Sequence, residues 1–456
     1  MKQRVLILTF LFLTTLIVNA QTDTKVVPDA KALKYRRSSL YMIMLDNPGT
    51  ANAEVIKKTF EGMTIPDKFN DHNLPAKNID ASKIVLTEEE KKKVEKKENK
   101  FGSFAKSLAA EGTGGVVDTT NTKYLPAKVD KYFNEHKVAR DLVAKWFNRS
   151  EKGTFNMNLI SERGSYDASA LDISNAKSSA RGLSTVSDAG EELIGNTFVV
   201  VNRFNYVTME SITAATQKLG NFAMALAAAS GNTVSSEVRQ ATDSIAKQIT
   251  GYAVQSTSYL YKLVWNDSIE AVFYQNYWMD DNSFDPAKKE AFDNTNLFTL
   301  ELIGDERANA AILEARNSNK PQNELVAKAT VNAFDAVIAK LQRKYEIFRT
   351  KTPLYSGEPI TAKIGLKEGL EPGDKFEVLE QTMDPKTGKT TYVKVGKIKV
   401  ERGMIWDNRF GAEDETVKAP ADATTSDAAT PAARIDRTTF SGGKGFYTGM
   451  LIRQKN

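Results

Sequence analysis

The stretch TFVVVNRFNYV, residues 197–207, contains four adjacent large apolar side chains, Phe198 to Val201. A half-exposed strand alternates apolar and polar side chains, whereas an unbroken apolar run indicates a strand that is buried on both faces. Such a strand lies inside a sheet that helices cover on both sides. The run therefore predicts the central strand of an α/β or α+β domain with three layers, a mixed sheet and flanking helices.

Segments before and after this run predict the other elements of that domain. Residues 40–45 form a short apolar run that the turn-forming residues 46–49 close, which indicates a second buried strand. In residues 129–147 and 334–348, apolar side chains recur at intervals of three and four. This period is typical of helices that bury one face.

We assign residues 21–352 to this domain and expect one exposed charged segment within it, residues 87–122. The segment starts with Thr87 and Glu90, a pair that forms a capping box at a helix N-terminus. Acidic and basic residues follow with almost no apolar side chain to bury, so we expect a helix or flap in contact with solvent.

An aromatic-rich region predicts a β-hairpin. Large side chains alternate with smaller ones from Tyr259 to Trp265, residues 266–268 are turn formers, and aromatic residues continue through residues 269–278. Alternation and aromatic enrichment are typical of strands. After the hairpin, Asp285 and Pro286 form the cap and first position of a helix.

The C-terminal part of the chain, residues 353–456, predicts a small all-β domain, either a barrel or a sandwich. Two alternating runs at residues 376–378 and 392–395 flank a turn at residues 384–388, and residues 398–400 predict a third strand. Residues 411–437 are rich in Ala, Thr, Asp and Pro, which predicts a disordered insertion.

The N-terminus has the pattern of a signal peptide over residues 1–20. Lys2 and Arg4 precede an apolar run at residues 5–18, and the small-residue cleavage pattern ends at Ala20. We expect an exported protein in the periplasm or associated with the outer membrane. The apolar run is shorter than the roughly 20 residues that span a bilayer, and we expect no transmembrane helix.

The charge distribution limits the kinds of partner we expect, and the cysteine content limits the cross-links. The chain has 62 Lys and Arg against 57 Asp and Glu, a formal net charge of +5, and the two signs are interspersed. Nucleic-acid binding requires clustered basic residues, so we expect no nucleic-acid partner. With no cysteine, the fold has no disulfide and must be held by buried apolar area.

The titratable residues predict no catalytic residue, no cofactor and no metal site. The chain has two histidines, His72 and His136, and we interpret both as surface residues. Without cysteine or paired histidines, a zinc site is not expected. The acidic run DDNSFD, residues 280–285, departs from the EF-hand pattern, and we interpret it as a helix-capping loop. Whether the protein is an enzyme stays open, with a non-enzyme favoured.

Glu162 and Arg163 are candidate ligand groups. They follow residues 155–159, which alternate as a strand does, and α/β folds often place ligand groups where a strand ends. The alternative is that both residues serve a turn from this strand into a helix.

The order of elements, FNMNLISERG and TFVVVNRFNYV before a small β module, resembles bacterial envelope assembly factors of the curli-secretion and flagellar-ring accessory class. The pattern in Gly373, Asp374, Phe376 and residues 395–400 supports this resemblance. It implies an α/β domain joined to a small β module. Unlike the curli lipoproteins, the chain has no lipid-acceptor cysteine.

Two short triplets are similar to those of exported Bacteroidetes proteins that carry O-glycans at Asp-Ser/Thr-aliphatic sequences. They are Asp243-Ser244-Ile245 and Asp267-Ser268-Ile269. This resemblance implies O-glycans on Ser244 and Ser268.

Together these patterns predict a non-catalytic, exported cell-envelope protein that acts in structural assembly or protein–protein docking. Its partners would be envelope proteins or further copies of itself, with peripheral association to the outer membrane. The alternative is a periplasmic protein that binds or processes carbohydrate, because the aromatic residues between Tyr259 and Trp278 could stack on sugars.

Overall fold

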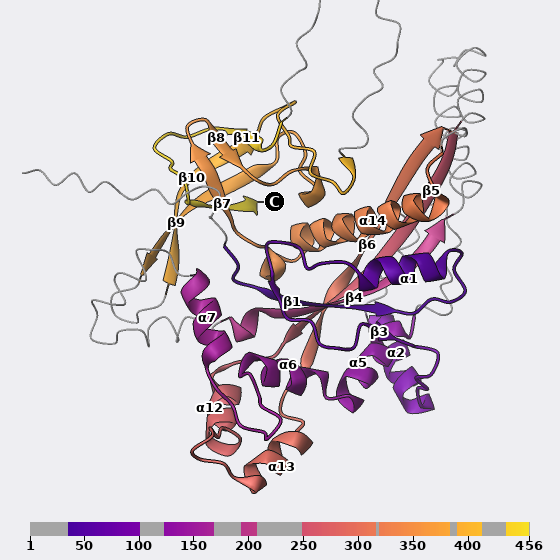
Figure 1. The fold of residues 1–456 in the computed structure, drawn as a ribbon, viewed down its shortest axis with the longest axis vertical. Helices are drawn as coiled ribbons and strands as arrows, with labels where there is room; N and C mark the ends of the chain where they lie inside the picture. Colours follow the sequence, from indigo (N-terminus) through magenta and orange to yellow (C-terminus); the bar gives the residue numbers. More distant parts are fainter. Residues whose placement is uncertain are drawn as a thin grey trace, which may run out of the picture.

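The computed structural model of the protein describes residues 35–100, 123–167, 193–207, 249–315, 319–383, 390–412 and 435–455 (Figure 1). Several sequence predictions lie outside these ranges. They are the signal peptide at 1–20, Ser244, residues 101–122 of the charged segment, the turn at 384–388 and residues 413–434 of the expected insertion. No helix in the described ranges combines the length and apolar character needed to cross a bilayer.

A mixed sheet forms the centre of the larger part of the fold. Its strands are β1 (Ser39–Leu45), β2 (Asn70–Asp71), β3 (Asn78–Ile79), β4 (Thr197–Val207), β5 (Ile249–Leu263) and β6 (Leu300–Ala315), in the order β2-β1-β4-β5-β6 with β3 also on β1. β1 is parallel to β2, β3 and β4, whereas β4, β5 and β6 are mutually antiparallel. The predicted central strand is confirmed, because β4 lies between β1 and β5.

Helices cover both faces of this sheet, as the apolar run predicts. On one face, α1 (Ala53–Glu61) and α14 (Gln322–Lys344) pack on Phe198 and Val200 of β4. On the other, α5 (Leu125–Glu135) and α6 (Val138–Trp146) pack on Val199 and Val201. Successive strand side chains point to opposite faces, so one continuous apolar run supplies both cores. Figure 1 shows the two helix layers on opposite sides of the sheet.

The predicted aromatic hairpin is wrong in its second half. Residues after Trp265 form helix α12 (Asp267–Asn276), because the Asn266 side chain accepts hydrogen bonds from the backbone N–H groups of Ser268 and Ile269 at 3.1 and 3.0 Å. An asparagine in this position caps a helix. β5 pairs with β6 instead, and α13 (Pro286–Asn294) follows with Asp285 as its cap, as predicted.

Two further helices start near residues that the sequence singles out. The capping box is confirmed, since the Glu90 N–H donates to Thr87 Oγ1 at 3.2 Å and the Thr87 N–H donates to Glu90 Oε2 at 2.6 Å before α2 (Glu88–Lys100). The predicted strand at residues 155–159 is wrong. Helix α7 (Asn158–Asp167) begins there, and its first N–H donates to Asn156 Oδ1 at 3.1 Å.

Six antiparallel strands of the C-terminal part close into a ring in the order β10-β11-β8-β7-β12-β9, which we call the strand ring. They are β7 (Thr352–Gly357), β8 (Ile360–Ala362), β9 (Lys375–Met383), β10 (Thr390–Val400), β11 (Thr438–Ser441) and β12 (Leu451–Lys455). The expected third strand at residues 398–400 is the second half of β10, which continues past a bulge next to Gly396. A Cβ at Gly396 would lie 2.4 Å from the Phe446 ring, so only glycine fits there.

Short 3-10 helices connect these parts. η1 (Ile194–Asn196) precedes β4, η2 (Glu346–Phe348) follows α14, and η3 (Leu366–Glu368) lies between β8 and β9. The chain thus passes from α14 through η2 directly into β7. The strand ring is consequently placed over the C-terminal half of α14 (Figure 1).

Candidate functional site

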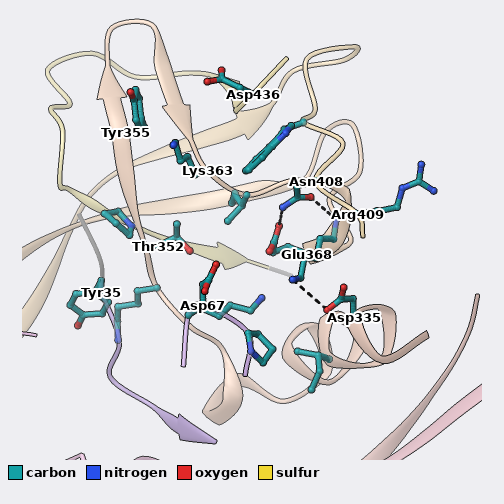
Figure 2. A pocket seen from close by; sticks show the side chains of 18 of the residues that line it. Tyr35, Asp67, Asp335, Thr352, Tyr355, Lys363, Glu368, Asn408, Arg409 and Asp436 are labelled. Carbon is teal, nitrogen blue, oxygen red and sulfur yellow. Dashed lines mark hydrogen bonds and ion pairs between the residues drawn. The ribbon is translucent and has the colours of Figure 1, made fainter. Parts of the chain in front are cut away.

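A cleft of about 700 Å³ lies between α14 and the strand ring, and it is the cleft meant below. Its lining comes from segments far apart in the sequence: residues 35–36, 66–68, 335–338, 351–355, 363–368 and 406–409, with Ala412 and Asp436. Figure 2 shows Asp335 on α14 facing the Glu368 and Asn408 side chains of the strand ring region.

Polar contacts hold the strand ring against α14 on either side of the cleft. The Arg343 Nη2 group donates to Asp374 Oδ2 at 2.8 Å and to the Gly369 carbonyl oxygen. Lys328 Nζ donates to the Gly411 carbonyl oxygen at 2.8 Å. These contacts fix the width of the cleft, because they join the helix to the ring-side loops at two separate points.

Charged side chains of both signs line the cleft. The cations are Arg36, Lys68, Lys351, Lys363, Lys367 and Arg409, and the anions are Asp67, Asp335, Glu368, Asp407 and Asp436. Most have a partner inside the protein, such as Arg409 with Asp407 at 2.6 Å and Glu368 with Asn408 at 2.8 Å. The cleft therefore offers a mixed, largely self-paired polar surface rather than one dominant charge.

One carboxylate oxygen of Asp335 has no such partner in the described residues. Its side chain is 8% exposed, and its Oδ2 atom is buried without a hydrogen-bond partner in the described part of the chain. The other oxygen, Oδ1, lies 3.8 Å from Lys367 Nζ. Burial raises the pKa of Asp335 to about 6, against the smaller opposing effect of Lys367. An acceptor without a donor is costly inside a protein, so this oxygen is the natural contact for a ligand that donates a hydrogen bond.

Two lysines of the cleft, Lys68 and Lys351, also have perturbed pKa values. Burial lowers the pKa of Lys68, whose Nζ donates to Gln342 Oε1 at 2.7 Å. Burial, and then the positive charges of Arg453 and Arg37, lower the pKa of Lys351 to about 8. Clusters of perturbed groups in a cleft mark candidate functional sites.

His72 is not a surface residue, so that interpretation is wrong. Its side chain is 0% exposed and packs against the Trp146 ring at 4.9 Å between ring centroids. Nε2 lies 2.9 Å from the Leu142 carbonyl oxygen, and Nδ1 lies 3.0 Å from Arg163 Nη1. Burial, and then Arg163, lowers the pKa of His72 well below its usual value, which keeps the imidazole neutral. His136 is exposed, as predicted.

Glu162 and Arg163 lie within α7, neither at the end of a strand nor in a turn, which corrects the placement that both alternatives assumed. Arg163 donates to Ser39 Oγ at 3.0 Å and to the Asp71 carbonyl oxygen at 2.7 Å, and its guanidinium lies 4.5 Å above the Trp146 ring. It joins α7 to β1, β2 and α6. Glu162 is exposed, and neither residue lines the cleft.

The DDNSFD loop caps a helix, as predicted. Asp285 Oδ1 accepts from the Ala287 N–H at 2.8 Å, and Asp280 Oδ1 accepts from the Asn282 N–H at 3.0 Å. Among the described residues, no three His, Cys, Asp or Glu side chains lie close enough together to hold a metal ion. Ser268 is exposed in the first turn of α12.

The aromatic side chains between Tyr259 and Trp278 form a core. Phe147, Phe155, Phe273 and Phe292 are fully buried there, and Trp265 and Trp278 pack against them. Phe147 stacks on Phe273 with ring centroids 4.3 Å apart. Trp265, Tyr274, Tyr277 and Trp278 are half-buried, so these rings pack on the core and keep only part of their surface in solvent.

The predicted site residues do not include the cleft, although α14 carries a signal for it. Lys328, Asp335 and Gln342 are buried polar residues spaced by seven, so they lie on one face of the helix. We call them the polar stripe of α14. Each contacts the ring side or the loops that line the cleft: Lys328 reaches Gly411, Asp335 reaches Lys367, and Gln342 binds Lys68. A polar face on an otherwise apolar helix predicts a second, polar partner.

The fold and site define an α+β protein with a mixed sheet, a closed ring of strands, and a polar cleft between them. No protein-family model matches the chain, and no curated protein matches it in sequence.

Proposed function

We propose that the protein is a non-catalytic, exported cell-envelope protein that acts in structural assembly, and that it docks a polar segment of a partner protein in the cleft. The observation that carries this proposal is Asp335, a nearly buried carboxylate whose Oδ2 has no donor in the described residues and which lines the cleft. A backbone N–H, a hydroxyl or a cationic side chain of a partner would supply that donor.

The size and lining of the cleft fit a polypeptide segment. Ligand pockets in proteins have volumes of roughly 300–1,000 Å³, and the cleft at about 700 Å³ falls inside this range. Eleven charged side chains of both signs line it, six cationic and five anionic. Charges of both signs favour a partner that itself carries both, because mismatched partners are repelled.

The proposal of an exported docking protein also draws on the sequence. The signal-peptide pattern at residues 1–20 and the resemblance to envelope assembly factors point to the cell envelope. Partners would then be envelope proteins or a second copy of this chain, with peripheral contact to the outer membrane. The packing of the rings between Tyr259 and Trp278 on an aromatic core leaves less ring surface for a sugar, which weakens the carbohydrate alternative at that region.

The test is site-specific photocrosslinking in intact cells that express the full chain. A photoreactive amino acid replaces Arg409, which is exposed at the rim of the cleft, or Val85, which is 75% exposed elsewhere. We expect an adduct of one defined mass from position 409 and none of that mass from position 85.

The substitution Asp335→Asn supplies the second arm of this test, because it removes the buried charge and keeps the side-chain shape. It should reduce the adduct from position 409 several-fold while the purified variant remains folded. The proposal fails if adducts form equally at both positions, or if Asp335→Asn leaves the adduct unchanged.

A carbohydrate ligand is the second candidate, and three aromatic side chains in the cleft favour it: Tyr35, Tyr355 and Trp406. Aromatic faces combined with carboxylates and an amide, here Glu368 and Asn408, suit a sugar. The Tyr355 ring is already covered by the Arg437 guanidinium at 4.4 Å, which leaves less ring surface for stacking. Binding on a glycan array that Trp406→Ala abolishes would favour this candidate over a protein partner.

A further inference from the structure

A second, smaller pocket has a different character from the cleft. Its volume is about 140 Å³, and it lies where the segment before β1, the loop that carries Lys68, η2 with the segment before β7, and strand β12 meet. Five cationic side chains line it, Arg37, Lys68, Arg349, Lys351 and Arg453, with Glu346 as the one carboxylate of its lining. We call it the basic pocket.

Two of these cations, Lys68 and Arg349, bind neutral acceptors. Lys68 binds the neutral amide of Gln342 at 2.7 Å. Arg349 donates to the carbonyl oxygens of Gln342 and Arg343 at 3.0 and 2.7 Å. Neutral acceptors satisfy hydrogen-bond donors but leave the positive charge in place. Two of the five cations therefore keep a full charge at the wall of the pocket.

The pocket lining holds one carboxylate, Glu346, against its five cations. Glu346 is 71% exposed and lies 3.9 Å from Arg453, a weak solvent-screened pair. Arg453 also binds Glu377 at 3.0 Å, a residue outside the lining. Within the lining the cations therefore outnumber the carboxylates, while Glu368 and Asp335 act on Lys68 from the cleft.

Lys351 is the most informative of the five. In the described part of the chain its ammonium group contacts no carboxylate and no hydrogen-bond acceptor, and lies 4.1 Å above the Tyr392 ring. Burial lowers the pKa of Lys351 to about 8, and the next causes are repulsion from Arg453 and Arg37. Like charges that repel across a small pocket are costly, and a bound anion would relieve that cost.

The dimensions of the pocket limit the anion. A volume of about 140 Å³ holds one tetrahedral oxyanion with a few waters, and it excludes a nucleotide or an oligosaccharide. Cations from four separate segments of the chain line the pocket, which suits an ion with several charged oxygens. A single carboxylate would neutralise one charge of the excess and leave the rest.

We propose that the basic pocket binds a phosphate group, either as free inorganic phosphate or as a phosphomonoester on a larger molecule. Lys351 and Lys68 supply ammonium donors, and Arg37, Arg349 and Arg453 supply the surrounding positive field. This inference does not depend on the partner that we propose for the cleft. A phosphate site next to the cleft would add a second, chemically distinct ligand to the protein.

The first test is calorimetric titration of the full chain with inorganic phosphate at pH 7. We expect saturable binding that Lys351→Met weakens by roughly tenfold or more, the effect of losing one charge-assisted contact. Lys351→Arg keeps the charge and should retain binding. Lys123→Met is the matched control, since Lys123 also lies over a tyrosine, Tyr124 at 5.4 Å, but outside the pocket.

A pH series with sulfate distinguishes titration of Lys351 from titration of the ligand, because sulfate keeps its two charges between pH 7 and 9. Binding should weaken as the pH rises through about 8, where Lys351 loses its proton. In Lys351→Met this weakening should disappear. The proposal is overturned if the folded wild-type chain shows no binding at millimolar phosphate, or if Lys351→Met binds as tightly as wild type.

Vesicles distinguish the two sources of phosphate. The full chain is sedimented with vesicles of phosphatidylcholine alone or with added phosphatidic acid, a lipid phosphomonoester. Recruitment by phosphatidic acid that free phosphate competes away, and that Lys351→Met abolishes, assigns the site to a lipid headgroup. Binding of free phosphate or glycerol 3-phosphate without recruitment assigns it to a soluble ligand, and loss of binding in every arm overturns the proposal.

Discussion

Asp335 is a carboxylate in a place that disfavours its charge. Its carboxylate lies on a helix whose other buried side chains are mostly apolar, and burial raises its pKa to about 6. Above pH 6 the folded protein must keep this group ionised in a place that disfavours charge. A protein optimised for stability alone would have an apolar or amide side chain there, so the retained charge is consistent with a ligand contact.

We predict that Asp335→Asn is more stable than wild type at pH 7 by about 1–2 kcal/mol, because asparagine cannot ionise. The folded pKa of Asp335 lies above the unfolded value, so the cost of ionisation is present above pH 6 and is lost as the pH falls toward 4. Urea unfolding at pH 7, 5.5 and 4.5 should show the gain shrink with falling pH.

Asp407→Asn is the matched control for this prediction. The guanidinium of Arg409 lowers the pKa of Asp407 by hydrogen bonding to it, so ionisation is favoured there and the substitution should give no gain at pH 7. A loss of stability in Asp335→Asn at pH 7 would contradict the prediction, since it would mean that the charge makes net favourable contacts.

His72 shows why burial of a single polar residue was not predictable. Its sequence neighbours Asp71 and Asn73 are polar, which suggests a surface loop. β2 covers two residues, Asn70 and Asp71, and the alternation along it turns Asn70 and His72 inward and Asp71 outward. Two residues are too few for a period-2 pattern to be visible in the sequence. The partner that makes the burial tolerable, Arg163, lies 91 positions away.

At the scale of elements, the sequence predicts those whose side-chain period is long and unambiguous. β4 and the apolar faces of α5, α6 and α14 are of this kind, because their apolar side chains repeat over several turns or an unbroken run. The single helix expected over residues 129–147 is wrong in one respect, since Lys137 has a left-handed backbone and divides it into α5 and α6. The region after Trp265 is ambiguous, since clustered aromatic residues fit both a strand and a helix that packs on an aromatic core. Asn266 decides between them by capping α12.

The capping role of Asn266 at the start of α12 can be tested by substitution. Asn266→Ala should destabilise the protein by about 1 kcal/mol, because the N–H groups of Ser268 and Ile269 lose their acceptor. Asn266→Asp, which keeps an acceptor, should retain most of the stability. Gln275→Ala, at an exposed position of the same helix, should change the unfolding midpoint little. Equal effects of Asn266→Ala and Gln275→Ala in chemical denaturation would contradict the role of the cap.

The polar stripe of α14 belongs to the same scale. The apolar side chains from Phe334 to Phe348 predict the helix, and its buried side packs on the sheet. The residues at 328, 335 and 342 face the strand ring and the cleft, which the apolar period alone could not predict because their partners lie in distant segments. The helix therefore has two buried faces, an apolar face for the sheet and a polar face for the ring.

For the whole molecule, these two faces make α14 the element that joins both sheets. The strands of the mixed sheet lie within residues 39–315 and those of the strand ring within residues 352–455. The expected small β module and the mixed α/β content could be predicted from local patterns. The position of the ring over α14, and with it both pockets, could not, because it depends on a few polar contacts between segments far apart in sequence.

A substitution at Arg343 tests whether polar contacts to α14 hold the strand ring in place. Its Nη2 group binds Asp374 Oδ2 at 2.8 Å and the Gly369 carbonyl oxygen, so Arg343→Met removes two contacts between α14 and the ring side. Asp374 keeps donors in the Glu371 N–H and Gln454 Nε2, which limits the loss to about 1–2 kcal/mol. We expect hydrogen exchange to speed up in residues 352–383, while β1 and β4 keep their protection.

Lys340→Met is the control for Arg343→Met, because Lys340 is exposed on the same helix. It should leave exchange unchanged throughout the chain. Faster exchange in β4 and in the ring strands to the same degree in Arg343→Met would mean that sheet and ring unfold as one cooperative unit. If exchange speeds up in the strand ring alone, the contact between the ring and α14 is less stable than the mixed sheet. A ligand that bridges the cleft should then restore the protection of the ring.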